Sequence, residues 1–212
     1  SETSGDKARN DYIKTLENWK KNTGEDKPKL VVINLSGGGS RSAMWAMTIL
    51  NNVDRALDNK LTKHTQMMTG ASGGMIGAAY YREILLRKHK GELKSKSNSE
   101  FVKNIGKDML NKLAFMASTN DIFIRYRKFN YAGHEYVIDR GYGFEQQLNE
   151  NTNSVLNHSL GYYKKYEQNG IIPTMIFSPT IVNDGRRLLI SSQSLRFLTN
   201  NSTSEFNSYE NI

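Results

Sequence analysis

The sequence predicts an α/β fold with a mainly parallel sheet flanked by helices. Two apolar segments, at 29–35 and 65–69, each end in a glycine-rich stretch, and each stretch opens a segment with helical apolar spacing. A strand, a glycine loop and a helix, repeated twice, are typical of parallel strands joined by right-handed crossovers. Ligands bind such sheets at the carboxyl ends of the strands, so both glycine loops are expected at one site.

The composition of the chain excludes several kinds of protein and of functional site. The chain has 212 residues, 37% of them hydrophobic and 24% charged, which suits one domain with a sizeable core. It has no cysteine, which excludes disulfides, thiolate metal sites and cysteine nucleophiles. Its four histidines lack the spacing of a metal site, so we expect no metal. No run of about 18 apolar residues occurs, so no membrane-spanning helix is expected.

The chain is basic, with 29 Lys and Arg against 21 Asp and Glu, a net charge of +8. Such a balance fits a nucleic acid partner, an anionic membrane or only a solvated surface. The charge is concentrated at 88–96 and at 125–128, where Tyr126 and Phe129 are aromatic neighbours. We expect peripheral contact with an anionic membrane surface and no nucleic acid.

The elements of the first half follow from apolar spacing. Tyr12, Leu16 and Trp19 lie at helical spacing and predict a short amphipathic helix that packs on the body of the protein. The continuous apolar run 29–35 predicts a buried parallel strand. Helical spacing resumes from Arg41, and the strand at 65–69 is followed by an apolar helix.

The second half is less regular. Residues 117–143 are aromatic and irregular, and fit either a lid over the site or an ordinary long insertion. The pair Asp184-Gly185 between two apolar runs is a strong hairpin signal. The remaining segments are expected to be a helix entered from a loop at 97–104, helices at 108–116 and 143–158, and strands at 171–182 and 188–192.

The stretch Gly70-Ala71-Ser72-Gly73-Gly74 has the form G-x-S-x-G. A serine nucleophile on a tight turn from strand to helix needs small neighbours, because the strand and the helix pass close together. The positive end of the following helix lies next to such a hydroxyl. An ordinary glycine turn is the alternative, and the position between an apolar strand and an apolar helix favours the nucleophile.

The second motif is Gly37-Gly38-Gly39-Ser40-Arg41. Consecutive glycines at the end of a strand expose backbone N–H groups that bind an anion. In a serine acyl hydrolase that anion is the oxyanion of the tetrahedral intermediate. Arg41 is expected to orient this loop, to neutralise a substrate phosphate, or to form a salt bridge at the start of the helix.

A dinucleotide site is the competing interpretation of this loop. The residues Gly37, Gly39 and Ser42 nearly match G-x-G-x-x-G/A between a strand and a helix. The acidic residue expected at the end of the second strand is missing, because that strand ends in Met-Met-Thr-Gly. A phosphate-binding loop of the Walker type also fails, since no Gly-Lys-Ser/Thr follows.

Together, the two motifs resemble those of the patatin-like phospholipases, with the close match over about residues 29–90. The resemblance implies an α/β fold of modified α/β-hydrolase type, a serine–aspartate dyad and no cofactor. It makes Ser72 the nucleophile and glycines 37–39 with Arg41 the oxyanion loop. A weaker likeness continues at 139–141 and at 179–187.

One departure concerns the base of the dyad. The family carries its aspartate in a D-G-G or D-G-A motif, and neither occurs here. The only Asp-Gly is at Asp184, in a setting typical of a hairpin turn, and the resemblance puts that hairpin before the dyad loop. We therefore expect the aspartate beyond residue 212. Asp184 as base, Asp139 with His158 in a hydrolase triad, and an inactive relative are the alternatives.

The sequence thus predicts a lipid acyl hydrolase of phospholipase A or lysophospholipase type. The alternatives are an inactive lipid- or protein-binding scaffold and, further off, a nucleotide-binding domain. The expected organisation is a helical extension at 1–28, an incomplete catalytic domain at 29–198 and a polar tail at 199–212. The absence of cysteine suits a secreted or envelope protein.

We also expect a set of side chains that forms a wall for the acyl chain of the substrate; the alternative is that these side chains only pack in the core. Its candidates are the apolar and aromatic residues Phe115, Met116, Ile122, Phe123, Ile124, Tyr126 and Phe129.

Overall fold

A four-stranded sheet forms the centre of the computed structural model, which describes residues 4–93, 98–119, 127–131 and 133–199. The strand order is β1-β2-β5-β6; β1 pairs with β2 and β2 with β5 in parallel, and β6 is antiparallel to β5. The strands are β1 (Val31–Leu35), β2 (Thr65–Gly70), β5 (Thr174–Phe177) and β6 (Ile190–Ser191). The predicted α/β class with a mainly parallel sheet is confirmed.

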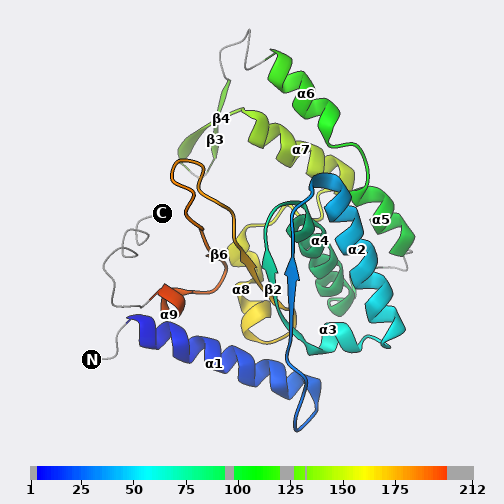
Figure 1. Ribbon diagram of the computed structural model, residues 1–212, viewed down its shortest axis with the longest axis vertical. Helices are drawn as coiled ribbons and strands as arrows, with labels where there is room; N and C mark the ends of the chain where they lie inside the picture. The colour runs from blue at the N-terminus through cyan, green and yellow to red at the C-terminus, as the bar shows by residue number, and fades with distance from the viewer. Residues whose placement is uncertain (1–3, 94–97, 120–126, 132, 200–212) are drawn as a thin grey trace.

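Helices flank this sheet, and a small separate hairpin of β3 and β4 lies beyond it (Figure 1). The hairpin consists of β3 (Lys128–Tyr131) and β4 (His134–Val137). The helices are α1 (Ser4–Thr23), α2 (Gly39–Ala56), α3 (Lys60–His64), α4 (Ser72–His89), α5 (Asn98–Ile105), α6 (Leu110–Thr119), α7 (Arg140–Thr152), α8 (Leu160–Gln168) and α9 (Arg196–Thr199).

The closest helix packing joins α2 and α4. A Cβ built on Gly77 would lie 2.2 Å from the carbonyl oxygen of Ala43, so only glycine lets the two backbones approach this closely. Met47 and Ala78, both buried, belong to the main core that these helices form over the sheet. Since α2 follows β1 and α4 follows β2, this packing brings the two glycine loops to the same end of the sheet.

The helix predicted near the N-terminus is confirmed as α1, which crosses the end of the molecule where β1 begins (Figure 1). Trp19, near the end of this helix, is buried. Two side-chain amides on α1 bind carbonyls at the end of α8: Asn18 donates to Gln168 at 2.8 Å and Asn22 to Asn169 at 2.7 Å. The helix is therefore tied to the body by both apolar and polar contacts.

A buried ion pair joins α4 to α8 on the side away from the glycine loops. Arg82 donates to Glu167, and both side chains are almost fully buried. Glu167 also accepts hydrogen bonds from Ser192 and Gln193, just after β6. These charge-assisted bonds offset part of the cost of burying the two charges, although burial still lowers the pKa of Arg82, and they fix α8 against α4 and the end of β6.

The predicted strand at 171–182 is longer than the one that forms. β5 covers only Thr174–Phe177, and the backbone N–H of Ser178 then donates to the carbonyl of Gly70 at 2.7 Å. Pro179 follows and has no N–H to continue the ladder. The hairpin around Asp184 is present as a turn closed by a bridge between Thr180 and Arg187.

Candidate functional site

Ser72 lies on the sharp turn between β2 and α4. Its backbone φ is 58°, in the left-handed region that non-glycine residues rarely adopt. The preceding Ala71 is still extended, and its N–H continues the ladder to the carbonyl of Leu35 at 3.3 Å. A strained serine at a strand-to-helix turn, with an exposed side chain, has the geometry of a nucleophile elbow.

The loop at 36–38, between β1 and α2, lies directly against this serine. A Cβ built on Gly37 would lie 3.1 Å from the Cβ of Ser72 and 3.4 Å from its Oγ, so a larger residue at position 37 would crowd the hydroxyl. Gly38 and Gly39 have φ of 138° and 62°, which favour glycine. The side chain of Ser42 donates back to the carbonyl of Ser36 at 2.9 Å and closes the loop.

The distance between the two motifs is fixed by backbone contact. A Cβ built on Gly73 would lie 1.9 Å from the carbonyl oxygen of Gly39, so any other residue at 73 has to separate the loops. The structure thus brings together Ser72 and glycines 37–39, as the sequence predicts. It also shows that Gly73 sets the distance between the two loops. From the sequence motif alone, position 73 is expected only to hold a small residue.

Two helix N-termini meet at this point, because α2 begins at Gly39 and α4 at Ser72. The N–H groups of a first helical turn have no partner within the helix, and the helix dipole is positive at this end. Neither first turn carries an acidic side chain. The arrangement favours a negative charge developing next to the hydroxyl of Ser72.

Ser72 also stands at the rim of an apolar pocket of about 130 Å³. Its walls come from α2 and α4 on one side and from α5, α7 and the start of α6 on the other. No charged side chain lines it. The lining residues are Gly39, Ser40, Ala43, Ser72, Gly73, Ile76, Ile105, Met109, Leu110, Phe144 and Leu148.

Arg41 is exposed in the first turn of α2. In the part of the chain that the structure describes, no acidic side chain pairs with it. The salt bridge considered for this residue is therefore not formed there. Orienting the loop and contacting an anionic group of a substrate remain the roles predicted for Arg41.

Asp184 does not contact Ser72. Its carboxylate accepts from Arg186, at 2.7 Å from Nε, and from the backbone N–H of the same residue at 2.9 Å. These bonds lower the pKa of Asp184. A carboxylate held in its ionised form by its own turn is a weak base, which argues against the role considered for it.

The two members of the alternative triad have other partners. Asp139 caps the N-terminus of α7, where its Oδ1 accepts from the N–H of Tyr142 at 2.9 Å. His158 stacks on Tyr162 at 4.1 Å between ring centroids. Over the described ranges 4–93, 98–119, 127–131 and 133–199, no carboxylate or imidazole lies within hydrogen-bond distance of Ser72 Oγ. The described residues therefore place no general base beside Ser72.

The acyl wall expected from the aromatic middle of the chain is not formed by the described members of that set. Phe115 is 66% exposed, Met116 packs against Gly143, and Phe129 stacks on Tyr136 at 5.6 Å. None of them lines the pocket at Ser72. The other four, at 122, 123, 124 and 126, lie outside the described residues.

The sequence did not indicate which residues wall the pocket. Ile105, Met109 and Phe144 come from helical segments far apart in the chain, and only tertiary packing brings them to Ser72. The apolar spacing of Phe144 and Leu148, one helical turn apart, indicated a buried face without saying what it faces.

Within the described residues, no three His, Asp or Glu side chains come together to hold a metal. None of the described helices is long and apolar enough to cross a membrane. The chain matches no protein-family model, no curated protein and no solved structure.

Proposed function

We propose that the chain is a serine lipid acyl hydrolase of the patatin-like kind, which cleaves the ester of a phospholipid, a lysophospholipid or another acyl ester. The observation that carries the proposal is the strained, exposed Ser72 set against the backbone of glycines 37–39 at the mouth of an apolar pocket. The resemblance of both motifs to the patatin-like phospholipases supports the same assignment. No cofactor or metal is part of it.

The proposed reaction has two steps. Ser72 loses its proton to a carboxylate base, its Oγ bonds to the ester carbonyl carbon, and the alcohol leaves with a proton as the acyl-enzyme forms. Water, deprotonated by the same base, then attacks the acyl carbon; the bond to Oγ breaks, Oγ takes the proton back from the base, and the fatty acid leaves. Backbone N–H groups of the loop at 37–39 and of Gly73 stabilise the oxyanion in both steps. Arg41 orients the loop or contacts a substrate phosphate.

Fluorophosphonate labelling with peptide mapping tests this proposal. An activated serine nucleophile forms a covalent adduct, so we expect label on the peptide that contains Ser72 and none in the Ser72→Ala variant. Ser118→Ala is the matched control, because Ser118 is exposed on α6, does not line the pocket and is expected to leave labelling unchanged. Hydrolysis of phospholipid vesicles and lysophospholipid is measured on the same three proteins.

The alternative is an inactive scaffold that binds lipid or a partner protein. The absence of a described carboxylate at Ser72 Oγ favours it. The scaffold predicts lipid binding that Ser72→Ala leaves intact, with no labelling of any serine in this pocket. Labelling at Ser72 excludes the scaffold, and hydrolysis that survives in Ser72→Ala excludes the proposed mechanism.

A further inference from the structure

The pocket beside Ser72 is about one helical turn deep. Ser72 and Ile76 lie four residues apart on α4, and Gly39 and Ala43 lie four residues apart on α2. Residues with this spacing stack on one helix face, about 5.4 Å apart along the axis. The reactive groups therefore form the rim, and the next turn of both helices forms the wall beneath it.

The residues that line the pocket differ in exposure. Ala43, Ile105 and Met109 are only 3%, 2% and 6% exposed, so we place the floor of the pocket at these buried residues. Leu110, in contrast, is 66% exposed and stands at the mouth with Ser72. A chain that enters past Ser72 meets the floor after one turn of helix.

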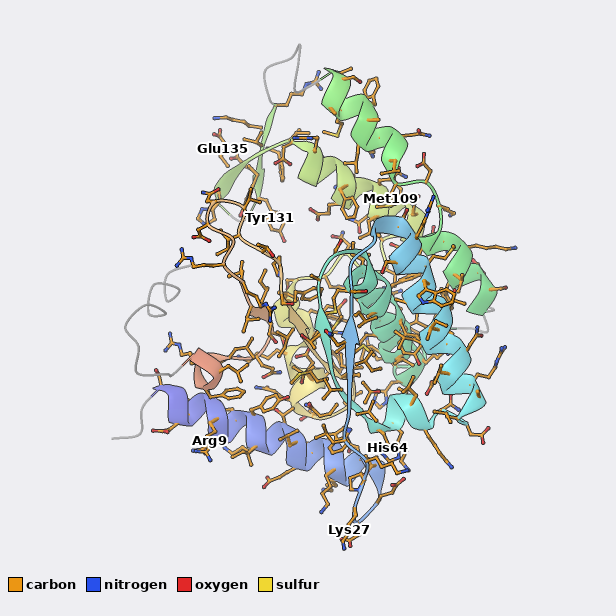
Figure 2. The ribbon with its side chains drawn as sticks, viewed as in Figure 1. Arg9, Lys27, His64, Met109, Tyr131 and Glu135 are labelled. Atoms are coloured by element: carbon orange, nitrogen blue, oxygen red, sulfur yellow. The ribbon has the colours of Figure 1, made fainter. Side chains whose placement is uncertain are left out.

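The floor is held in position by a hydrogen bond. Asn151 Nδ2 lies 3.1 Å from the Sδ of Met109, and the same amide donates to the carbonyl of Asp108 at 3.1 Å. Figure 2 shows Met109 between the start of α2 and α7. A methionine is otherwise an adaptable side chain, so this anchor from α7 gives the pocket a defined depth.

From this geometry, and resting on the proposed function, we infer that the site accepts a short acyl chain, of up to about six carbons. Its volume of about 130 Å³ is close to that of an engineered apolar cavity of about 150 Å³ that holds benzene, a six-carbon ligand. The carboxyl end of the acyl group lies at Ser72 and the loop at 37–39, and its last carbon contacts Met109. Longer chains have to leave their remaining carbons outside.

Fatty acid anions of graded length test the inference without the need for turnover. The carboxylate mimics the product at the N-termini of α2 and α4, and the tail probes the pocket. The chain is labelled at its methionine methyl groups and titrated with butyrate, hexanoate, octanoate and decanoate below their micelle concentrations. The NMR signal of the Met109 methyl group reports binding at the floor, and that of Met44, which is 42% exposed outside the pocket, reports adsorption elsewhere.

The expected dissociation constant falls about fourfold for each added CH₂ up to about six carbons, because each buried CH₂ contributes that factor. Beyond six carbons the gain stops. In Met109→Ala the limit moves about two to three carbons longer, since the floor is removed. Met44→Ala is the matched control and leaves the limit unchanged; Leu148→Ala widens the wall from α7 and serves if Met109→Ala fails to fold.

Three outcomes overturn the inference: affinity that rises steadily through decanoate, a limit that does not respond to either pocket variant, or a Met109 signal that no anion shifts. Failure of the proposed function looks different. If fluorophosphonate does not label Ser72 while the six-carbon limit holds, hydrolysis is wrong and the pocket's selectivity stands. If Ser72 is labelled and the limit is absent, only the chain-length inference fails.

Discussion

Ser72 is held in a left-handed backbone conformation with φ of 58°, which costs a non-glycine residue about 1–2 kcal/mol. The conformation occurs where the extended end of β2 passes into the first turn of α4. The other described non-glycine residues with a positive φ, Asp58, Asn59, Asn153 and Ser154, lie in turns at helix ends, so Ser72 differs from them by its place between a strand and a helix.

The positive φ at position 72 predicts different stabilities for two substitutions there. Ser72→Gly removes the conformational cost and Ser72→Ala keeps it, so the glycine variant is expected to be the more stable by about 0.5–1 kcal/mol, or about 1–4 °C in Tm. Thermal unfolding followed by circular dichroism measures the difference. At Ser40, inside α2 and without a positive φ, the order is expected to reverse, with Ala above Gly. The same order at both positions contradicts the argument.

A second residue-scale prediction concerns Gly77, whose missing Cβ lets α4 approach α2. Gly77→Ala places a methyl group 2.2 Å from the carbonyl oxygen of Ala43 and is expected to destabilise the fold by about 1–3 kcal/mol or more. Gly161→Ala on α8 is the control: its nearest contact would be at 3.9 Å, so the substitution is expected to stabilise by about 0.5–1 kcal/mol. Urea titration measures both, and equal effects would be inconsistent with the close helix contact.

At the scale of elements, α4 carries the reactive serine at its start and polar anchors along its length. Tyr81 donates to Asp54 on α2 at 3.0 Å and also lies 2.8 Å from the hydroxyl of Thr62. Asp54 accepts in turn from the N–H of Thr62 at 2.7 Å. This network fixes the end of α2 against α4 and α3, and so supports the contact between the glycine loops from one side.

The network also predicts how stability depends on pH. Burial raises the pKa of Tyr81 well above its ordinary value; the hydrogen bond with Thr62 opposes this in part, and the charge of Asp54 and the hydrogen bond to it raise the pKa further. An unfolded tyrosine ionises near pH 10, so above that pH the unfolded chain has lost a proton that the folded chain keeps. The free energy of unfolding is therefore expected to fall as pH rises above about 10.

Tyr81→Phe tests the assignment, because it removes one ionising group and makes the alkaline decline shallower by up to about 1.4 kcal/mol per pH unit. Denaturant unfolding between pH 8.5 and 11 measures the slope. The control is Tyr131→Phe, since Tyr131 is 68% exposed on β3 and is expected to leave the slope unchanged. Identical slopes in wild type and Tyr81→Phe would show that this tyrosine does not set the decline.

Features that depend on residues close together in the sequence could be predicted, and features that depend on contacts between distant residues could not. Ser72 and glycines 37–39 could be found because a turn that needs small residues and a backbone N–H nest is encoded within five residues. The helix at α1 and the parallel pair β1–β2 could be predicted from apolar spacing for the same reason. The floor at Met109 could not, because it is set by Asn151 from another helix, and the short β5 depends on a hydrogen bond to Gly70 that no local pattern contains.

For the whole molecule, the net charge of +8 predicts contact with anionic lipid. We expect the protein to co-sediment with vesicles that contain phosphatidylserine and to bind phosphatidylcholine vesicles far less. Raising the salt from ~50 to ~300 mM shortens the screening length and is expected to release the protein. Equal binding to both vesicle types at all salt concentrations would show that charge does not direct it.

The contact between Gly39 and Gly73 lies wholly within the unbroken stretch from β1 to α4. The turn at Ser72 and the loop at 37–39 can thus be assembled early during synthesis, before the ribosome has made the helices that wall the pocket. The same separation bears on evolution. Mutations in α5 to α7 can reshape the pocket, and with it the acyl chain that we propose it binds, while the arrangement next to Ser72 is inherited unchanged.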